Sequence, residues 1–490
     1  MNRPRAVVLS LGLGLLAAAG CRRDDAPGWA SGTVECDVVR VASRHGGRVA
    51  RLKRLHYGFK RLHEIFTARL TAEPIYELKM AFSLHAHLCC EHAGALRRRV
   101  GEMREPPLGL DQVPDPDLEF LFNEILAAPS TGELLVGLYE IALPAVVRAF
   151  HRHLRDTNRL VDHPTVRLCR FALLELEEVA EYGRTAIGCL VDAPQRAAMG
   201  PWTDLLARVL SGCGDLHGAD PESRQPRVPH HSATSFRYDG VPRRDERFLD
   251  PYNMGVHAEV FLYDESRRPE DKALMMYYKR LREIDVPEMM ASILTETPGK
   301  PWAYYQDMTR QLWDEARHAM MGEVGFVQAG IHWPDHVRVN FTWSLALNTQ
   351  LTPDERHAVL YFIEQGLMPR SGKRYEWEVG VKSGSPFAAM IQDYDWADEV
   401  LHARVGRDWY VSRFPNAHEA VEHGDRCWSK ALMNWQAYRD QGLTRHDNWW
   451  PGLYRAACEA RGSIPDPGVL EYHATYAEAR ADLKATSLPG

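Results

Sequence analysis

The 490-residue chain lacks several features that would assign it to a familiar class. None of its nine cysteines has the CxxC spacing of a zinc knuckle or a thioredoxin-like redox pair. Basic residues (59) do not outnumber acidic ones (66), and the formal charge of −7 argues against a nucleic-acid partner. No phosphate-binding loop is recognisable, and strand patterns are sparse after residue 60. These absences favour a mostly helical globular protein of two or three domains.

Long apolar runs are scarce, and the one at the N-terminus is too short to span a bilayer. Residues 1 to 21, MNRPRAVVLSLGLGLLAAAGC, have an arginine-bearing start, an apolar run and a small-residue exit. This layout predicts an export signal, with a buried apolar helix as the alternative. The ending AAGC resembles the lipobox of bacterial lipoproteins, which implies that Cys21 is lipidated and anchors the protein to the cell envelope.

The remaining eight cysteines point to a different compartment. Most of them lie in apolar helical sequence, where a free cysteine behaves as a small hydrophobic residue. This pattern fits a reduced compartment better than an oxidising one. Localisation therefore stays open between the cell envelope, if the signal is used, and the cytoplasm.

Residues 22 to 53 predict a short β segment. Apolar and polar residues roughly alternate from Val34 to Val41, and Gly46-Gly47 follows as a turn. This stretch resembles the start of HlyD-type periplasmic adaptor lipoproteins, but the resemblance stops near Leu52. The sequence leaves open whether residues 1 to 52 belong to the working protein or are a fusion.

The rest of the chain predicts an all-α protein in four parts. Residues 54 to 211 form an N-terminal helical domain, residues 212 to 270 an irregular linker, residues 271 to 410 a second helical domain, and residues 411 to 490 a helical extension. The third helix of the second domain begins with Thr352 as N-cap, Pro353 at the first helical position and Glu355 completing a capping box.

Two copies of one motif carry the functional prediction. WDEARHAMMGE (313 to 323) and WADEVLHARVG (396 to 406) each contain Asp-Glu followed by a histidine three residues after the glutamate. No other Glu-x-x-His pair occurs in the chain. Because residues i and i+3 share one helix face, the glutamate and histidine of each pair can converge on one metal ion.

Lone glutamates on two further helices complete the predicted site. Glu283 lies 13 residues before Glu296 and Glu315 lies 14 residues after Pro301, so a rise of 1.5 Å per residue brings them to one height in an antiparallel hairpin. Glu288 would fall short of that height and is the substitute for Glu283. The predicted ligands are Glu283, Glu315, His318, Glu364, Glu399 and His402.

Residues 271 to 410 resemble the ferritin-like di-iron carboxylate superfamily in the order of these motifs. The resemblance implies a four-helix bundle with two iron ions, although manganese or a mixed pair also suits the ligands. It implies that Asp314 and Asp398 orient the ligand histidines. The expected partners are O2, an unknown organic substrate and an electron donor, and the expected reaction is oxidation or oxygenation.

Two alternative functions and the role of the N-terminal helical domain remain open from the sequence. A non-enzymatic scaffold would keep the metal for stability only, and a membrane-anchored adaptor would follow from the N-terminal segment. The N-terminal helical domain, which has no Glu-x-x-His pair, is either a degenerate relative of the bundle or a docking domain. Substrate, reductant and oligomeric state are not determined by the sequence.

Overall fold

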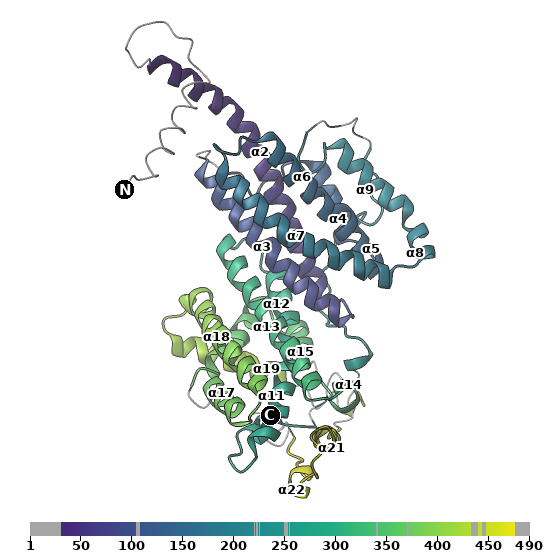
Figure 1. The fold of residues 1–490 in the computed structure, drawn as a ribbon, viewed down its shortest axis with the longest axis vertical. Coiled ribbons are helices and arrows are strands. Elements are labelled where there is room, and N and C mark those ends of the chain that lie inside the picture. The colour runs from purple at the N-terminus through teal and green to yellow at the C-terminus, as the bar shows by residue number, and fades with distance from the viewer. Residues whose placement is uncertain are drawn as a thin grey trace, which may run out of the picture. The chain divides into compact units, whose positions relative to one another are not determined.

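In the computed structural model, the regular elements of the described part of the chain are all helices (Figure 1). It describes residues 31–103, 108–219, 221, 224, 226–248, 253, 255–339, 342–369, 372–432, 440–442 and 447–475. Contacts divide the chain into two compact units, Met1–Ala50 and Arg51–Gly490. The site described below lies in the second unit. The predicted signal segment and Cys21 lie outside the described residues.

The β segment predicted within residues 22 to 53 is wrong, because one helix, α2, runs from Ser31 to Leu70. Its apolar positions explain the error. Val34, Val38 and Val41 are spaced i, i+4 and i+7, which satisfies a helical period as well as a short alternation does. The Gly46-Gly47 pair, predicted to be a turn, lies inside the helix.

The helices of the N-terminal half follow α2 in close succession. In chain order they are α3 (Tyr76–Glu102), α4 (Pro116–Leu126), α5 (Thr131–Val136), η1 (Gly137–Ala142), α6 (Leu143–Asp156), α7 (His163–Leu190), α8 (Ala193–Ala198) and α9 (Gly200–Gly212). The stretch Thr131–Asp156 is long and apolar enough to cross a membrane by length and composition, and 67% of its most apolar window is buried inside the protein, as in a core helix.

Residues 212 to 270 contain little regular structure in their described part, namely the short helices η2 (Glu246–Phe248) and α10 (Ala258–Leu262). The second half then continues with α11 (Pro269–Arg282), α12 (Asp285–Glu296), α13 (Trp302–Gln328), α14 (Trp333–His336), α15 (Thr342–Gln350), α16 (Pro353–Gly366), α17 (Lys373–Lys382), α18 (Pro386–Trp409), η3 (Val411–Arg413), α19 (Ala417–Leu432), α21 (Trp450–Arg461) and α22 (Pro467–Leu470).

Local sequence explains the helix boundaries that position the site. The capping box at Thr352 and Glu355 is confirmed, with both reciprocal hydrogen bonds present at the start of α16. The break between α11 and α12 falls at Glu283, four residues before Pro287. A proline ring clashes with the carbonyl of residue i−4 and cannot donate to it, so Pro287 accounts for a helix end at Glu283.

Helix α13 packs against α11, α12 and α18, and α18 packs against α16 and α17. The tightest approach is at Gly322 of α13, where an added Cβ would overlap the backbone of Tyr277 and Leu281 in α11. This contact lets the end of α11 lie against α13. The N-terminal helices also reach α13, since His63 Nε2 lies 2.9 Å from Thr309 Oγ1.

Replacing Gly322 with alanine is therefore expected to destabilise the protein by about 1–3 kcal/mol, because backbone of α11 must move to admit the methyl group. Urea unfolding followed by circular dichroism measures this loss. Gly188→Ala in α7, where nothing lies within 4 Å of an added Cβ, is the matched control and should be neutral or stabilising. Equal effects of the two substitutions would contradict the close approach.

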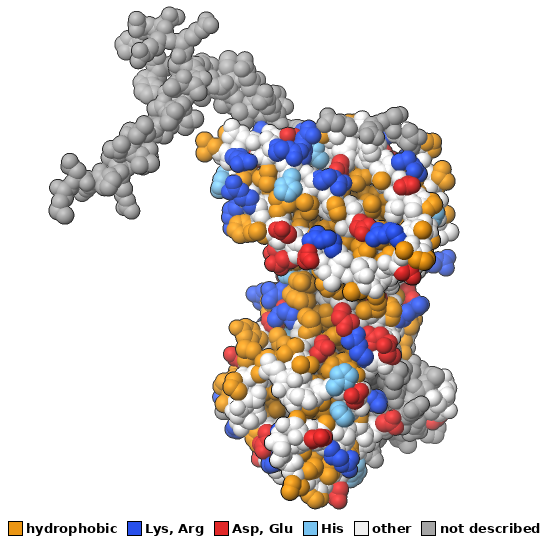
Figure 2. Space-filling view, turned by 45° about the vertical axis from the view of Figure 1, so that its right-hand side comes forward, with side chains coloured by type: hydrophobic (Ala, Val, Ile, Leu, Met, Phe, Trp, Pro, Cys, Tyr) orange, Lys and Arg blue, Asp and Glu red, His pale blue; other side chains and the backbone are white. Residues whose placement is uncertain are grey.

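Basic and acidic side chains are interspersed over the face of the molecule shown in Figure 2. Apolar side chains lie between them on this face, and no single sign of charge dominates it.

The second half of the chain has two large clusters of buried apolar side chains. One lies around α11, α13 and α21, and the other around α12, α13, α16 and α19.

Candidate metal centre

The two Glu-x-x-His motifs lie on facing helices, Glu315 and His318 on α13 and Glu399 and His402 on α18. Glu364 comes from α16, and Glu283 from the break that ends α11. Helix packing thus brings all six predicted ligands into one region. Five of them are at most 4% exposed, and the side chain of Glu283 is 14% exposed.

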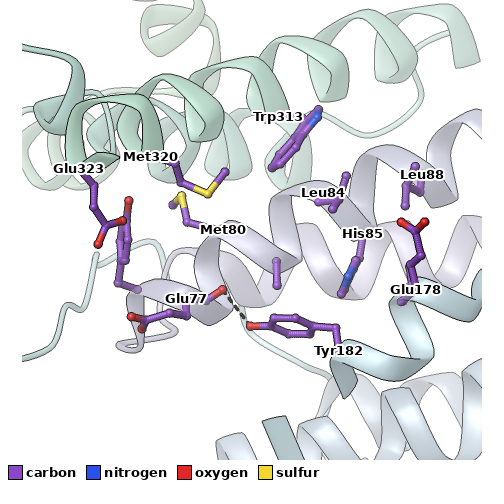
Figure 3. A pocket seen from close by; sticks show the side chains of 13 residues that line it. Glu77, Met80, Leu84, His85, Leu88, Glu178, Tyr182, Trp313, Met320 and Glu323 are labelled. Atoms are coloured by element: carbon purple, nitrogen blue, oxygen red, sulfur yellow. Dashed lines mark hydrogen bonds between the residues drawn. The ribbon is translucent and has the colours of Figure 1, made fainter. Parts of the chain in front are cut away.

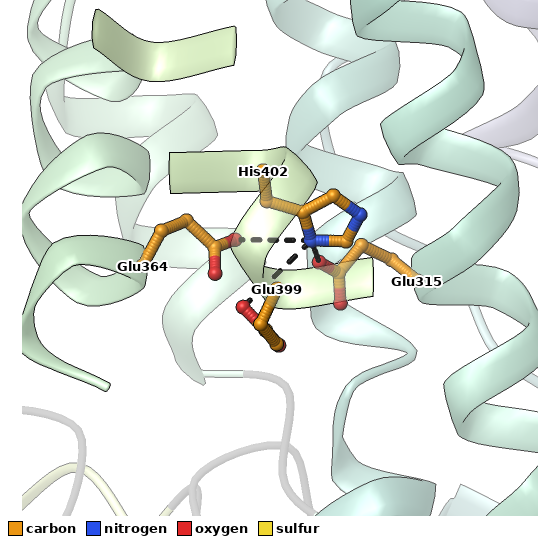
Figure 4. A group of neighbouring side chains, drawn as sticks. All are labelled: Glu315, Glu364, Glu399 and His402. Atoms are coloured by element: carbon orange, nitrogen blue, oxygen red, sulfur yellow. Dashed lines mark ion pairs between the residues drawn. The ribbon is translucent and has the colours of Figure 1, made fainter. Parts of the chain in front are cut away.

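The first group of ligands, here called position A, contains Glu315, Glu364, Glu399 and His402 (Figure 4). Each offers one ligand atom, and these atoms all lie within 4.8 Å of one another. The Nδ1 of His402 lies 3.0 Å from Glu315 Oε1, 3.7 Å from Glu399 Oε2 and 4.0 Å from Glu364 Oε1. Three carboxylates therefore surround one imidazole nitrogen.

The second group, position B, contains Glu283, His318 and Asp395. The Nδ1 of His318 lies 3.5 Å from Glu283 Oε2 and 3.5 Å from Asp395 Oδ1. It also lies 3.4 Å from Oε2 of Glu315, whose other oxygen faces His402. Glu315 therefore stands between the two positions, as a carboxylate that bridges two metal ions does.

Several ligand atoms at both positions are buried and have no hydrogen-bond partner. They are Nδ1 of His318, Nδ1 of His402, Oε1 of Glu315, Oε2 of Glu283 and Oε2 of Glu399. Buried polar atoms are normally paired, and leaving them unpaired costs free energy. Metal ions at A and B would complete these groups, so the residues present fit a pair of cations.

The aspartates that precede the two motifs contact the histidines crosswise. Asp398 of α18 lies 3.2 Å from Nε2 of His318 on α13, and Asp314 of α13 lies 3.5 Å from Nε2 of His402 on α18. The hydrogen bond of Asp398 keeps the proton on Nε2 of His318 and leaves its Nδ1 free for a metal, and Asp314 is the carboxylate that faces Nε2 of His402. Arg317 donates to both aspartates and holds them in place.

Asp398→Asn is expected to weaken metal binding at position B by about 10- to 100-fold, and Asp314→Asn to do so at position A, because each loses the carboxylate that orients one histidine. Competition with a chelating dye measures both affinities. Each variant is the control for the other, since the aspartate acts on the partner helix. If either substitution instead weakens metal binding at the position whose histidine lies on the same helix as the replaced aspartate, the crosswise arrangement is contradicted.

Without a metal, bound protons reduce the electrostatic repulsion between the buried carboxylates. Burial and the adjacent carboxylates of Glu399 and Glu315 raise the pKa of Glu364 well above its usual range. Burial favours neutral His318, but its contacts with Asp398, Glu283 and Glu315 outweigh burial and raise its pKa to about 10. Metal ligation requires deprotonated ligands, so loading the centre would release protons.

Sequence analysis missed three charged residues at position B, namely Asp395, Lys373 and Arg280. Asp395 could have been found, because Asp395, Glu399 and His402 are spaced i, i+4 and i+7 on one face of α18. Lys373 and Arg280 carry no such signal, since neither belongs to a motif. All three side chains are fully buried beside the predicted ligands.

Glu288, the predicted substitute for Glu283, does not reach the centre. Its carboxylate pairs with Lys79 at 2.9 Å and with Arg244 at 2.8 Å. In the described part of residues 54 to 211 no group of metal-ligating side chains is found. Glu175 of α7, for example, pairs with His92 at 2.7 Å instead.

Two cavities among the described residues lie outside the centre. In one, of about 430 Å³, Trp313 and Met320 of α13 face Met80 and Leu84 of α3 (Figure 3). Another, of about 690 Å³, is lined by residues of α2 and of the turn between α12 and α13. None of the six predicted ligands lines either cavity.

Comparison of the chain with protein-family models, with curated proteins and with solved structures gives no match.

Proposed function

We propose that the chain is a dinuclear-metal oxidoreductase that uses O2 to oxidise or hydroxylate an organic substrate. The observation that carries the proposal is the convergence of two Glu-x-x-His motifs and two further glutamates, with unpartnered ligand atoms, in a buried region. Without a metal, the buried carboxylates depend on protons at Glu364, His318 and His402, which a pair of divalent cations would replace.

The ligand chemistry favours iron, with manganese or a mixed pair as the alternatives. Carboxylates and imidazoles together suit these metals, whereas a set without sulfur does not suit soft ions. One glutamate from each of two helices and a Glu-x-x-His motif from each of two others is the ligand pattern of ferritin-like di-iron and di-manganese proteins. The same pattern supports the proposal of a ferritin-like four-helix bundle.

Glu283, Glu315, His318, Glu364, Glu399 and His402 would hold two iron ions, which in the reduced state would supply the electrons that O2 chemistry needs. The protein's own contribution is to hold the ligands. Glu315 offers one oxygen to each position, Asp314 and Asp398 fix the histidine rings, and burial keeps bulk water away. Hydroxylation of a C–H bond by O2 yields an alcohol and water and consumes two further electrons and two protons, so an external electron donor is part of this proposal and the protons come from solvent.

One observation favours a second function, a scaffold that keeps its metal for stability. Neither of the two large cavities reaches a predicted ligand, so a path for an organic substrate to the centre is not evident from them. A scaffold would bind metal and leave O2 unconsumed. The membrane-anchored adaptor stays a prediction about residues outside the described part of the chain.

Metal content and O2 uptake test the proposal. The protein is reconstituted anaerobically with Fe²⁺, its metal content is measured by mass spectrometry, and O2 consumption is followed with a reductant present. We expect about two ions per chain and O2 uptake, and His402→Ala should lose the ion at position A together with O2 uptake. His357→Ala, which removes another buried histidine outside the centre, should keep both. Failure to bind any metal would overturn the proposal, and binding without O2 uptake would leave the scaffold.

A further inference from the structure

The ammonium group of Lys373 lies inside the candidate metal centre. The side chain is fully buried, and its Nζ lies 2.9 Å from Asp395 Oδ1, 3.1 Å from Asp395 Oδ2 and 2.8 Å from Glu399 Oε1. Glu283 Oε1 lies 3.8 Å away. Lys373 thus contacts both carboxylates of position B. It also contacts Oε1 of Glu399 at position A, which we call the outer oxygen because Oε2 is the oxygen near His402.

A second buried cation reinforces this arrangement. Arg280, near the end of α11, donates to Asp395 and lies 2.8 Å from Glu283 Oε1 through its NH2 group. Position B therefore has two carboxylates that face a lysine and an arginine. With His318 neutral, as a metal ligand must be, the formal charges of these four side chains sum to zero.

Position A has a different electrostatic environment. Its three carboxylates belong to Glu315, Glu364 and Glu399, and the neutral amide of Gln311 donates to Glu364 at 3.0 Å. Among the ion pairs of the described residues, the basic side chains that contact the oxygens of Glu315 and Glu364 are those of His318 and His402 alone. Only the outer oxygen of Glu399 is shared with Lys373. Position A thus keeps an excess of negative charge.

Contacts between described residues at the end of α16 and the start of α17 hold Lys373 in this place. The backbone N–H of Lys373 donates to the carbonyl of Leu367 at 3.2 Å, and that of Gly372 donates to Pro369 at 2.8 Å. A Cβ at Gly372 would overlap the carbonyl of Leu367, so only glycine fits there. Lys373, as the first residue of α17, is consequently directed toward α18.

We infer that the two metal positions are unequal: position A binds an ion tightly, and Lys373 with Arg280 makes position B a weak, second-filled position. This inference rests on the proposed metal-binding function. The attraction between a divalent cation and its ligands falls when neighbouring cations already neutralise those ligands. With one ion at A, Lys373 takes the electrostatic place of the second ion. An ion entering B must draw Asp395 and Glu283 away from the two cations.

A direct titration tests the inference. Mn²⁺ is added to the full-length protein without O2, and free Mn²⁺ is measured by electron paramagnetic resonance. We expect two binding events whose affinities differ roughly tenfold or more. Lys373→Met should tighten the weaker event by roughly tenfold or more, and the tighter event by less, because Lys373 contacts only one of the three carboxylates of position A. Lys373→Arg, which keeps the charge, should retain the weak event.

Lys79→Met is the matched control, because it removes a buried lysine that contacts Glu288 and no predicted ligand. Circular dichroism establishes that each variant is folded, and Lys373→Gln replaces Lys373→Met if the latter is not. Two equal, tight events in the unaltered protein would overturn the inference while the proposed function stands. An unchanged weak event in Lys373→Met and Lys373→Gln would also overturn it. No bound Mn²⁺ in any variant would overturn the proposed metal function itself.

Discussion

Glu315→Ala is expected to abolish metal binding at both positions, from about two ions per chain at saturating metal to none. Its Oε1 lies 3.0 Å from His402 Nδ1 and its Oε2 lies 3.4 Å from His318 Nδ1, so one substitution removes an oxygen from each position. Loss of a shared carboxylate also leaves two ions without the negative charge between them. Mass spectrometry of the reconstituted, desalted protein measures the number of ions retained.

Glu283→Ala is the matched control for this effect. Of the two ligand histidines, its carboxylate faces only His318, at 3.5 Å, so the substitution should reduce binding at position B and leave one ion at A. The pair of variants thus separates a bridging ligand from a terminal one. If Glu315→Ala keeps one ion as Glu283→Ala does, then Glu315 does not bridge the two positions.

Glu288→Gln is expected to destabilise the fold by about 3–5 kcal/mol without reducing metal content. Glu288 is fully buried and pairs with Lys79 and Arg244, whose side chains are also buried. A neutral amide leaves these two cations without one of their counter-charges in a region that excludes water. Guanidinium unfolding measures the loss, and metal analysis of the same sample shows that Glu288 is not a ligand.

The effect of Glu288→Gln should depend on pH. Burial opposes ionisation of Glu288, but Arg244 and Lys79 outweigh burial and lower its pKa to about 2. A lowered folded-state pKa stabilises the protein above the unfolded-state pKa, near 4.3, and this contribution is lost as pH falls toward 2. The difference between the variant and the unaltered protein should therefore be largest near neutral pH and shrink between about pH 4 and pH 2.

Glu140→Gln provides the comparison for that prediction. Glu140 pairs with Arg196 on the surface, where both side chains are about 40% exposed. Exposed ion pairs contribute about 1 kcal/mol or less. A loss from Glu140→Gln as large as that from Glu288→Gln, or a Glu288→Gln loss that does not change with pH, would show that the buried ion pairs are not the cause.

The features that sequence could predict are local ones. The capping box at Thr352 depends on residues three apart in the chain, and the structure has it as predicted. The spacing of each Glu-x-x-His pair also specifies one helix face. Which helices meet at that face depends on tertiary packing. The all-helical character follows from the periodic apolar pattern over most of the described chain.

The features that sequence could not predict come from long-range packing or from ambiguous periods. Val34, Val38 and Val41 suited both a strand and a helix, and the helix formed. Lys373 is directed toward the centre by the backbone hydrogen bonds of Lys373 and Gly372 to Leu367 and Pro369. Such contacts do not produce a residue spacing that could be recognised in the sequence. Glu283 and Glu288 were distinguished by helix rise alone, and the structure adds the break caused by Pro287, which places Glu283 at a helix end.

The crosswise contacts of Asp314 and Asp398 make the two motif helices depend on each other. Each helix supplies the histidine of one position and the aspartate that orients the histidine of the other. Sliding α18 along α13 by one helical turn, 5.4 Å, would separate both pairs at once. A bound metal would therefore lock the axial register of the two helices. A fragment that carries only one of the motifs would lack the means to complete either position.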